Sequence, residues 1–465
     1  MQNSKKYTAK ICIYVDFERK KRYNRGTIEL EVFMLKRKIM DVLLEWKSKK
    51  NKECLLVKGA RQIGKTFIIR EFAKQNYDNF IELNFFLEPR HKEIFSGSLE
   101  MSEIIKRLTL QIPIAKFTPG KTLLFLDEIQ ECGEARTALK FIAENNKFDC
   151  IASGSMLGVA FKNTSSIPVG YEKQIEMHSM DFEEFLWALG FDETPIGYLK
   201  EYMDKKEKVP TSINDSYLEK LREYAVVGGM PAVVNKYIET KNFGEVHAEQ
   251  EKIIASYLDD IAKHASTSEK PKARACYLSI PNQLAKENKK FQFSVVEKGG
   301  TARKFDSSLE WLRDAGLIKF CNNVTTPTFP LPAYNQTGYF KIYLTDIGIL
   351  NAMYGFDMKA EVFNNTVKGS AKGGVYENLI ADILLKKNLS LNYYKPGENK
   401  QELEFLLSKN GNIIPLEVKA GNSSTNSLND FIKEFKPPYA LKLITGNVGE
   451  SETKLTLPLY MAMFL

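Results

Sequence analysis

A short run of residues after an apolar segment has the composition of a phosphate-binding loop. The segment ECLLVKG (53–59) is strand-like, and FIIREFAKQ (67–75) has the pattern of a helix. Glycines let backbone N–H groups approach phosphate oxygens, and a helix start offers unpaired N–H groups and the positive end of its dipole. We therefore expect this loop to bind ATP, with Lys65 at the β- and γ-phosphates and the Thr66 hydroxyl on Mg²⁺. The loop consists of Gly59, Ala60, Arg61, Gln62, Ile63, Gly64, Lys65 and Thr66.

Hydrolysis of ATP needs a carboxylate near the metal and a group that orients the attacking water. The apolar run LLFL (123–126) is followed by Asp127 and Glu128. Asp127 lies 62 residues after Lys65. We predict that Asp127 holds Mg²⁺ and that Glu128 polarises the water. An apolar run that ends in two acidic residues is common by itself, but behind a phosphate loop it indicates hydrolysis rather than binding alone.

The next strand-like run, DCIASG (149–154), ends in polar residues that could sense the γ-phosphate. Ser153 is the candidate and Ser155 the reserve, although serine and glycine also end strands without any such role. An arginine that contacts the transferred phosphate cannot be selected, since the spacing favours neither Arg61 nor Arg136.

Short apolar strands alternating with helices must position these groups. Four strand-like runs between residues 53 and 157, separated by helical stretches, predict an α/β fold with a parallel sheet and right-handed crossovers. Residues 181–264 are mostly helical in pattern, with an interruption at 228–231. Two helices and a ribbon-like segment at 338–346 follow. The last hundred residues return to mixed α/β, with a helix at about 375–387 and strands at 391–395, 403–408 and 412–420.

Charge and cysteine content limit the class of protein. The net charge of +8 lies entirely within residues 1–50, and residues 51–465 carry 52 charges of each sign, so a nucleic-acid surface there must be local. Six scattered cysteines are typical of reduced thiols in a cytoplasmic protein, and no apolar run approaches the roughly 18 residues of a membrane span. Residues 1–33 form a basic extension, and Met34 is a possible alternative start.

The runs GARQIGKT, LLFLDEIQ, ASGSMLG, MDFEEFLWA and VVGGMPAVV together resemble prokaryotic AAA-type ATPases with a C-terminal domain of unknown function 4143. The resemblance extends from about Met34 to the C-terminus. It implies that Gly229 and Pro231 lie in a helical lid beside the adenine, although the same residues also suit a helix-breaking turn. Many relatives carry a Gly-Arg pair where this sequence reads PVGY (168–171), which puts the role of that arginine in doubt.

The resemblance also implies a winged-helix module after the lid. The runs SIPNQLAKENKK (279–290) and ARKFDSSLEWLRDAGLIKF (302–320) fit two of its helices and a following strand. Such a module can place its second helix in the major groove of DNA, where Arg303, Lys304 and Arg313 would meet phosphate. Winged helices also dock proteins, so a protein partner is the alternative.

A second candidate site lies near the C-terminus, where Glu377 on a helix precedes Glu404 and then Glu417-x-Lys419 on neighbouring strands. This pattern resembles the restriction-endonuclease-like fold. Residues two apart in a strand face the same side, so Glu417 and Lys419 point together, and Glu404 can join Glu417 on one Mg²⁺. That fold usually has Asp where Glu404 stands. The alternative is an inactive fold in which these groups form an ion-pair network.

The sequence therefore predicts five parts: a basic extension (1–33), a P-loop ATPase core (34–200), a helical lid (201–270), a winged helix (271–360) and a restriction-endonuclease-like domain (361–465). Three functions stay open. The first is an ATPase whose nucleotide state moves its C-terminal domains. The others are an ATP-regulated, metal-dependent DNA nuclease or defence effector and a slow nucleotide-switched binding protein. Oligomers are possible, and a membrane partner is not expected.

Overall fold

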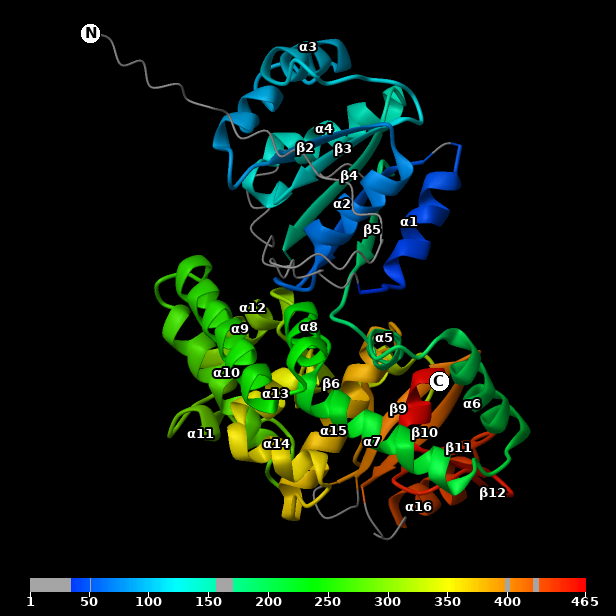
Figure 1. Ribbon diagram of the computed structural model, residues 1–465. Helices are drawn as coiled ribbons and strands as arrows, with labels where there is room; N and C mark the ends of the chain where they lie inside the picture. Colours follow the sequence, from blue (N-terminus) through cyan, green and yellow to red (C-terminus); the bar gives the residue numbers. More distant parts are fainter. Residues whose placement is uncertain (1–34, 51, 156–169, 398–401, 421–425) are drawn as a thin grey trace. The chain divides into compact units, whose positions relative to one another are not determined.

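A computed structural model describes residues 35–465, except for residues 51, 156–169, 398–401 and 421–425 (Figure 1). The predicted extension 1–33 lies outside the described residues, as do Pro168 and Val169. Among the described residues, no helix is both long and apolar enough to cross a membrane.

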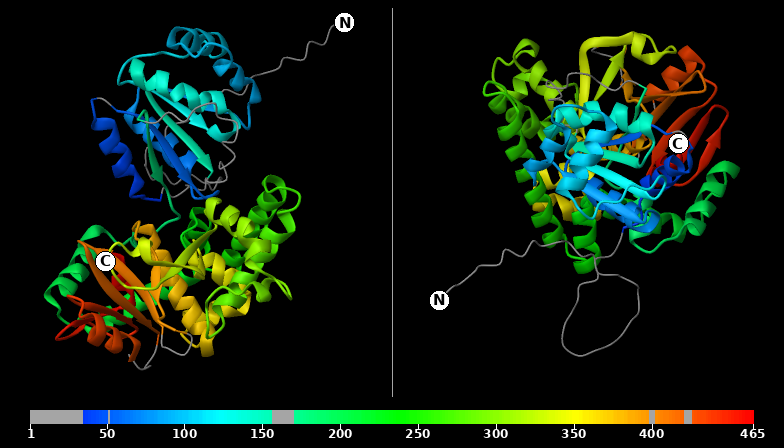
Figure 2. Two further views of the ribbon diagram at one scale, coloured as in Figure 1. Left: turned by 180° about the vertical axis from the view of Figure 1, so that it is seen from behind. Right: turned by 90° about the horizontal axis from the view of Figure 1, so that it is seen from above.

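A parallel five-stranded sheet forms the first part of the described chain. Its strands lie in the order β2-β3-β4-β1-β5 (Figures 1 and 2). Every residue of β3 and β4 is buried, which is typical of parallel strands covered on both faces. The predicted α/β fold with a P-loop type of parallel sheet is confirmed. The strands are β1 (Cys54–Gly59), β2 (Asn79–Asn84), β3 (Thr122–Asp127), β4 (Asp149–Ser155) and β5 (Glu172–Glu176).

Helices cover both faces of this sheet. On one face, α1 (Ile39–Ser48) and α2 (Lys65–Asn76) pack against apolar side chains of β1, β3 and β4. On the other face lie α3 (Met101–Gln111), α4 (Gly133–Asn145) and the 3₁₀ segment η1 (Pro89–Phe95). A second 3₁₀ segment, η2 (Ile129–Glu131), follows β3.

The chain leaves β5 and enters a helical region. A hydrogen-bonded capping box starts the first of these helices at Asp181, and Pro231 occupies the first turn of another, a position where its missing N–H costs nothing. The helices are α5 (Phe182–Ala188), α6 (Glu193–Lys205), α7 (Thr211–Val227), α8 (Pro231–Thr240), α9 (Phe243–His264), α10 (Lys270–Leu284), α11 (Phe293–Val296) and α12 (Ala302–Asp314).

A mixed eight-stranded sheet occupies the C-terminal part, in the order β12-β13-β11-β10-β9-β8-β6-β7. Its strands are β6 (Ile318–Val324), β7 (Asn335–Leu344), β8 (Asn392–Tyr394), β9 (Leu403–Lys409), β10 (Asn412–Lys419), β11 (Ala440–Ile444), β12 (Gly449–Ser451) and β13 (Lys454–Pro458). The hairpin of β6 and β7 joins the later strands because β6 pairs in parallel with β8. The sheet thus continues across residue 360, where the sequence suggested a boundary.

Helices α13 (Ile347–Met353), α14 (Phe356–Phe363), α15 (Gly369–Lys386) and α16 (Asn426–Phe435) accompany this sheet, with 3₁₀ segments η4 (Leu331–Tyr334) and η5 (Leu459–Phe464). Two glycines show how closely the helices approach. A Cβ atom on Gly348 of α13 would overlap the carbonyl oxygen of Val227 in α7, and one on Gly374 of α15 would overlap that of Leu284 in α10. Helices α13 and α15 therefore pack with close backbone contact against α7 and α10.

Candidate nucleotide-binding site

The predicted phosphate loop links β1 to α2. Gln62 and Gly64 take left-handed backbone conformations, with φ of 65° and 92°, and Gly64 immediately precedes the first residue of α2. The Lys65 ammonium donates to the carbonyl oxygens of Gly59 (2.9 Å) and Ala60 (2.7 Å). Burial lowers the pKa of Lys65 to about 8, and the charges of Glu128 and Asp127 oppose that shift. The loop therefore combines a helix N-terminus with a cation held close to it.

Asp127, at the end of β3, accepts hydrogen bonds from three neighbouring elements. The Thr66 hydroxyl lies 3.1 Å from Oδ2, Asn84 Nδ2 at the end of β2 lies 2.9 Å from the same oxygen, and the Ser153 hydroxyl of β4 donates to Oδ1. The structure thus brings together three candidate residues of the sequence, Thr66, Asp127 and Ser153. Asn84 was not predicted, because an asparagine at a strand end carries no recognisable motif.

A hydroxyl and a carboxylate are the hard oxygen ligands that Mg²⁺ prefers, so Thr66 and Asp127 fit the predicted metal. Among the described residues, no group of three or more His, Cys, Asp or Glu side chains could hold a metal ion. Mg²⁺ at nucleotide sites commonly takes its other ligands from phosphates and water.

Glu128 follows β3 directly and has a left-handed backbone conformation (φ 54°). Its Oε2 atom accepts a hydrogen bond from Nε2 of Gln130. A Cβ atom on Gly154 would lie 2.9 Å from Gln130 Oε1, so the glycine leaves room for Gln130. Gln130 is a second supporting residue that the sequence did not reveal.

The other phosphate-sensing candidates occupy different environments. Arg61 forms an ion pair with Asp260 of α9, and Arg136 forms a buried one with Glu172 of β5 (2.8 Å). Each guanidinium is therefore committed to a carboxylate of its own chain. The hydroxyl of Ser155 is buried and has no hydrogen-bond partner among the residues that the structure describes, whereas Ser153 contacts Asp127.

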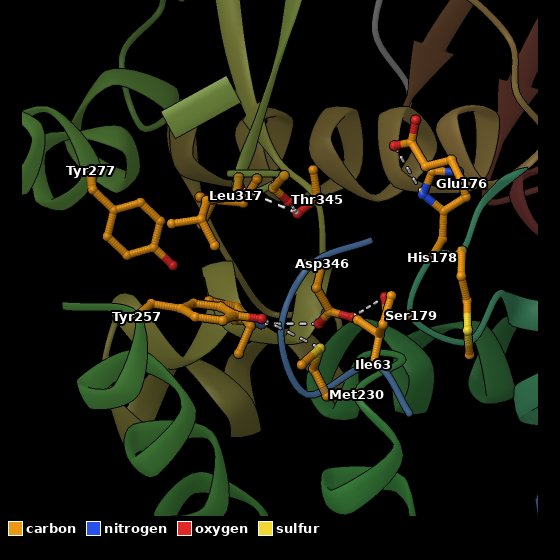
Figure 3. A pocket seen from close by; sticks show the side chains of 15 residues that line it. Ile63, Glu176, His178, Ser179, Met230, Tyr257, Tyr277, Leu317, Thr345 and Asp346 are labelled. Atoms are coloured by element: carbon orange, nitrogen blue, oxygen red, sulfur yellow. Dashed lines mark hydrogen bonds and ion pairs between the residues drawn. The ribbon is translucent and has the colours of Figure 1, made fainter. Parts of the chain in front are cut away.

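The Gly-Gly-Met-Pro stretch lies beside the phosphate loop. A Cβ atom on Gly64 would be 3.6 Å from Pro231 Cγ, and one on Gly229 would overlap the backbone of Met180. The amide of Gly229 donates to Asp346 Oδ2 at 2.8 Å. A pocket next to the loop is lined in part by Ile63, Met230, Tyr257, Tyr277, Leu317 and Asp346 (Figure 3).

The C-terminal acidic residues form two sets of ion pairs. Lys419 Nζ lies 2.9 Å from Glu404 Oε1 and 3.5 Å from Glu417 Oε1, so these three candidate residues lie together. Glu377 instead contacts Lys341 (2.6 Å) and Lys289 (3.2 Å).

Charges and burial set the protonation of these carboxylates. Burial raises the pKa of Glu404 to about 7 against the pull of Lys419, with Glu377 and Glu417 adding to the rise. Glu377 is also buried, but Lys341 and Lys289 lower its pKa to about 2. One oxygen each of Glu404 and Glu417 is buried and has no hydrogen-bond partner among the described residues. Two carboxylates with free oxygens fit a divalent cation that takes further ligands from a phosphate substrate.

The predicted DNA-contacting residues lie on or near α12. Lys304 pairs with Glu297 at 2.7 Å, and Arg313 pairs with its neighbour Asp314 at 2.9 Å. Arg303 is exposed. Helix α12 contains three basic residues (Arg303, Lys304, Arg313) and three acidic ones (Asp306, Glu310, Asp314), so it offers no net positive charge. The winged-helix fold and a DNA partner stay predictions.

A phosphate loop after the first strand, acidic residues at the end of β3 and this strand order define a P-loop ATPase of the AAA class. Residues 51–186 match the family model described as AAA domain, and residues 372–459 match the domain of unknown function DUF4143. The chain thus contains an AAA-type P-loop ATPase domain and, towards its C-terminus, a DUF4143 domain, which supports ATP binding and ATPase activity. Residues 218–360 match another domain of unknown function, DUF8612.

Comparison with curated proteins finds no match. Among solved structures, the chain is similar to the Walker-type ATPase PABY2304 of Pyrococcus abyssi, with a TM-score of 0.40, 14% identity and coverage of 69% of this chain and 96% of that one. It is also similar to the Orc1 protein of Aeropyrum pernix in complex with DNA (TM-score 0.29, 12% identity, 70% and 92% coverage).

Proposed function

We propose that the protein hydrolyses ATP with Mg²⁺ at the phosphate loop and uses the nucleotide state to rearrange its C-terminal part. The observation that carries this proposal is the meeting of Lys65, Thr66, Asp127, Glu128 and Ser153 at the carboxyl ends of β1, β3 and β4. The parallel sheet brings the ends of different strands to one edge, where these residues can act on the same ligand.

Each residue has a distinct role in this proposal. The Lys65 ammonium leaves the carbonyls of Gly59 and Ala60 and pairs with the β- and γ-phosphates. Ser153 and Asn84 fix the orientation of Asp127. Glu128, held by Gln130, orients the attacking water and accepts its proton. Mg²⁺ bound at Thr66 and Asp127 would supply charge neutralisation on the phosphates.

The proposed switch depends on contacts around the pocket in Figure 3. The Tyr257 hydroxyl of α9 donates to the carbonyl of Arg61 in the phosphate loop (3.2 Å), and Asp346 binds both Gly229 and Ser179 (2.8 Å each). A change in the conformation of the phosphate loop on hydrolysis would therefore be transmitted to α8, α9 and α13. Pro231 next to Gly64 supports a place for the adenine beside the lid.

Substitution of Glu128 by glutamine tests the catalytic assignment. We expect Glu128→Gln to bind ATP with unchanged affinity but to release phosphate at least 100-fold more slowly, because a positioned general base commonly contributes that much. Exposed Glu134→Gln, in α4, is the matched control and should keep wild-type turnover. Equal turnover in Glu128→Gln would contradict the role assigned here. Tightly retained ADP with very slow turnover in the wild type would favour the nucleotide-switched binding protein.

A metal-dependent DNA nuclease is the second candidate, favoured by one carboxylate oxygen each of Glu404 and Glu417 next to Lys419. Neither oxygen has a hydrogen-bond partner in the part of the chain that the structure describes. Glu377 lies near enough for its charge to raise the pKa of Glu404, while its own oxygens pair with Lys289 and Lys341. Single- and double-stranded DNA incubated with Mn²⁺ or Mg²⁺, with and without ATP, tests this activity. Cleavage should disappear in Lys419→Ala and persist in exposed Lys409→Ala. No cleavage by the wild type, or cleavage unchanged by Lys419→Ala, would favour the ion-pair network.

A further inference from the structure

Arg37, which lies just before α1, makes contacts that no motif in the sequence accounts for. Its side chain is only 7% exposed, and its guanidinium donates in three directions. Nη1 donates to the carbonyl oxygen of Ile63 (3.0 Å), Nη2 to that of His178 (2.7 Å), and Nε to Glu184 Oε1 (3.1 Å). One side chain therefore joins the phosphate loop, the segment after β5 and helix α5.

Both carboxylate oxygens of Glu184 also accept hydrogen bonds from the backbone. Its Oε1 also accepts the backbone N–H of Lys38 (2.7 Å), and its Oε2 accepts that of Asp181 (3.0 Å) in the capping box of α5. Buried ion pairs add little net stability compared with apolar side chains of similar volume. A planar guanidinium held by one carboxylate and two carbonyls does, however, fix geometry well.

The position of the Ile63 carbonyl matters for phosphate binding. In a planar trans peptide, the C=O of one residue and the N–H of the next point in opposite directions. Because Arg37 holds the Ile63 oxygen, the N–H of Gly64 must point away from Arg37. Gly64 can take this orientation at φ 92°, and its N–H is one of the loop donors available to a phosphate.

We propose that Arg37 is a positioning residue: it turns the Ile63–Gly64 peptide so that the Gly64 amide faces the phosphates, and it anchors the loop to residue 178. Its Nε, Nη1 and Nη2 atoms each donate to a protein atom, so the role assigned to Arg37 is exerted through the loop. The inference rests on the proposed ATP site.

Arg37→Lys tests this role, since an ammonium cannot reach three acceptors in a fixed planar fork. The loop amides bind phosphate in the ground state and the transition state alike, so a misaligned amide raises KM and leaves kcat nearly unchanged. We expect KM for ATP to rise about tenfold with kcat within twofold of wild type. The control is Arg90→Lys, an Arg to Lys change at a 73% exposed side chain, which should change neither constant.

Further measurements separate this role from a purely structural one. A structural role alone would lower the melting temperature and the active fraction, so kcat would fall at constant KM, and that result would overturn the proposal. Unchanged KM in a folded Arg37→Lys would also overturn it. If Arg37→Lys does not fold, Glu184→Gln tests the role instead, because it keeps a hydrogen-bond acceptor for Arg37 but removes the negative charge. We then expect a smaller rise in KM for ATP. An unchanged KM would refute the role of Arg37.

A wild type without ATP turnover would refute the proposed function rather than the role of Arg37. In that case, titration with a fluorescent ATP analogue replaces the kinetic measurement. The Kd should rise about tenfold in Arg37→Lys, and an unchanged Kd would refute the role of Arg37 by itself.

Discussion

Asp127 and Glu128 are the acidic residues of the proposed nucleotide site, and their positions depend on side chains elsewhere in the chain. Asn84 and Ser153 hold Asp127, and Gln130 holds Glu128. A carboxylate surrounded by donors keeps its orientation before any ligand binds. Substitutions at the supporting residues should therefore affect catalysis without loss of the fold.

Gly154→Ala is the sharpest test of this support. The new methyl group would lie 2.9 Å from Gln130 Oε1, the flexible end of a side chain, so the fold should persist while Gln130 moves. We expect ATP turnover to fall about tenfold with unchanged nucleotide affinity, because Glu128 loses part of its orientation. Gly197→Ala in α6 is the control, since a Cβ there meets nothing within 4 Å. Steady-state phosphate release checks the prediction, and equal rates in both variants would contradict it.

The sequence shows the motif residues of the site but not their supports. Lys65, Thr66, Asp127 and Glu128 are recognisable because their chemistry fixes residue type and spacing within a strand and loop. Arg37 lies in a run of three basic residues, Lys36 to Lys38, and nothing local tells which of them turns inward. The sequence pattern groups Glu377 with Glu404 and Glu417. In the structure, Glu377 accepts a hydrogen bond from Lys341, which lies 36 residues earlier in the chain.

Helix α15 connects two regions of the C-terminal part. Near its middle, Glu377 contacts Lys341 of β7. Near its end, Asp382 and Lys386 meet the hydroxyl of Tyr224 in α7 at 2.9 and 2.8 Å, and Lys386 also donates to the carbonyl of Met180 (3.1 Å). Helix α15 therefore connects the Glu377–Lys341 pair with the segment that follows β5.

The buried end of α15 should make stability depend on pH. Burial raises the pKa of Asp382 to about 7, and the nearby charge of Asp346 adds to the rise, while Lys386 opposes it. A raised folded-state pKa means that ionisation costs stability as pH rises from about 4 to about 7. Asp382→Asn avoids this cost. Its melting temperature relative to wild type should increase between pH 5 and 7 and then level off.

Thermal unfolding at several pH values measures this difference. Exposed Asp204→Asn in α6 serves as the control and should show a constant offset from wild type. A constant offset for Asp382→Asn as well would mean that the carboxyl group does not titrate in this range.

Most elements could be predicted where their pattern is local. The apolar runs of β1 to β4 alternate with helices, and the structure confirms them. Strand β5 was not predicted, because its sequence EKQIE is mostly polar and only its pairing with β1 makes it a strand. Helix α15 begins at Gly369, six residues before the predicted start, since three glycines among its first six residues hide the helical pattern.

At the scale of the whole described chain, the eight-stranded sheet joins segments that the sequence suggested were separate. The pairing of Asn322 with Asn392 and of Asn323 with Tyr393 links β6 to β8 across residue 360. Sequence patterns show where strands lie but not which distant strands pair, so this continuity could not be predicted.

Two fragments test the continuity of the sheet. Residues 361–465 alone would expose the edge of β8 and the faces of α15 that pack on α10 and β7, and we expect no cooperative unfolding transition. Residues 177–465 keep these contacts and should unfold cooperatively. Circular dichroism during heating checks both. A cooperative transition for the shorter fragment would show that it is an independent domain.

The pairing of β6 with β8 also bears on how such chains change during evolution. Recombination near residue 360 would leave two unpaired strand edges, which invite aggregation. Recombination near residue 177, by contrast, cuts through a connecting segment and leaves both sheets whole. Related genes should therefore exchange the stretch that holds the eight-stranded sheet as one block, and an ATPase core joined to the last hundred residues alone should not survive selection.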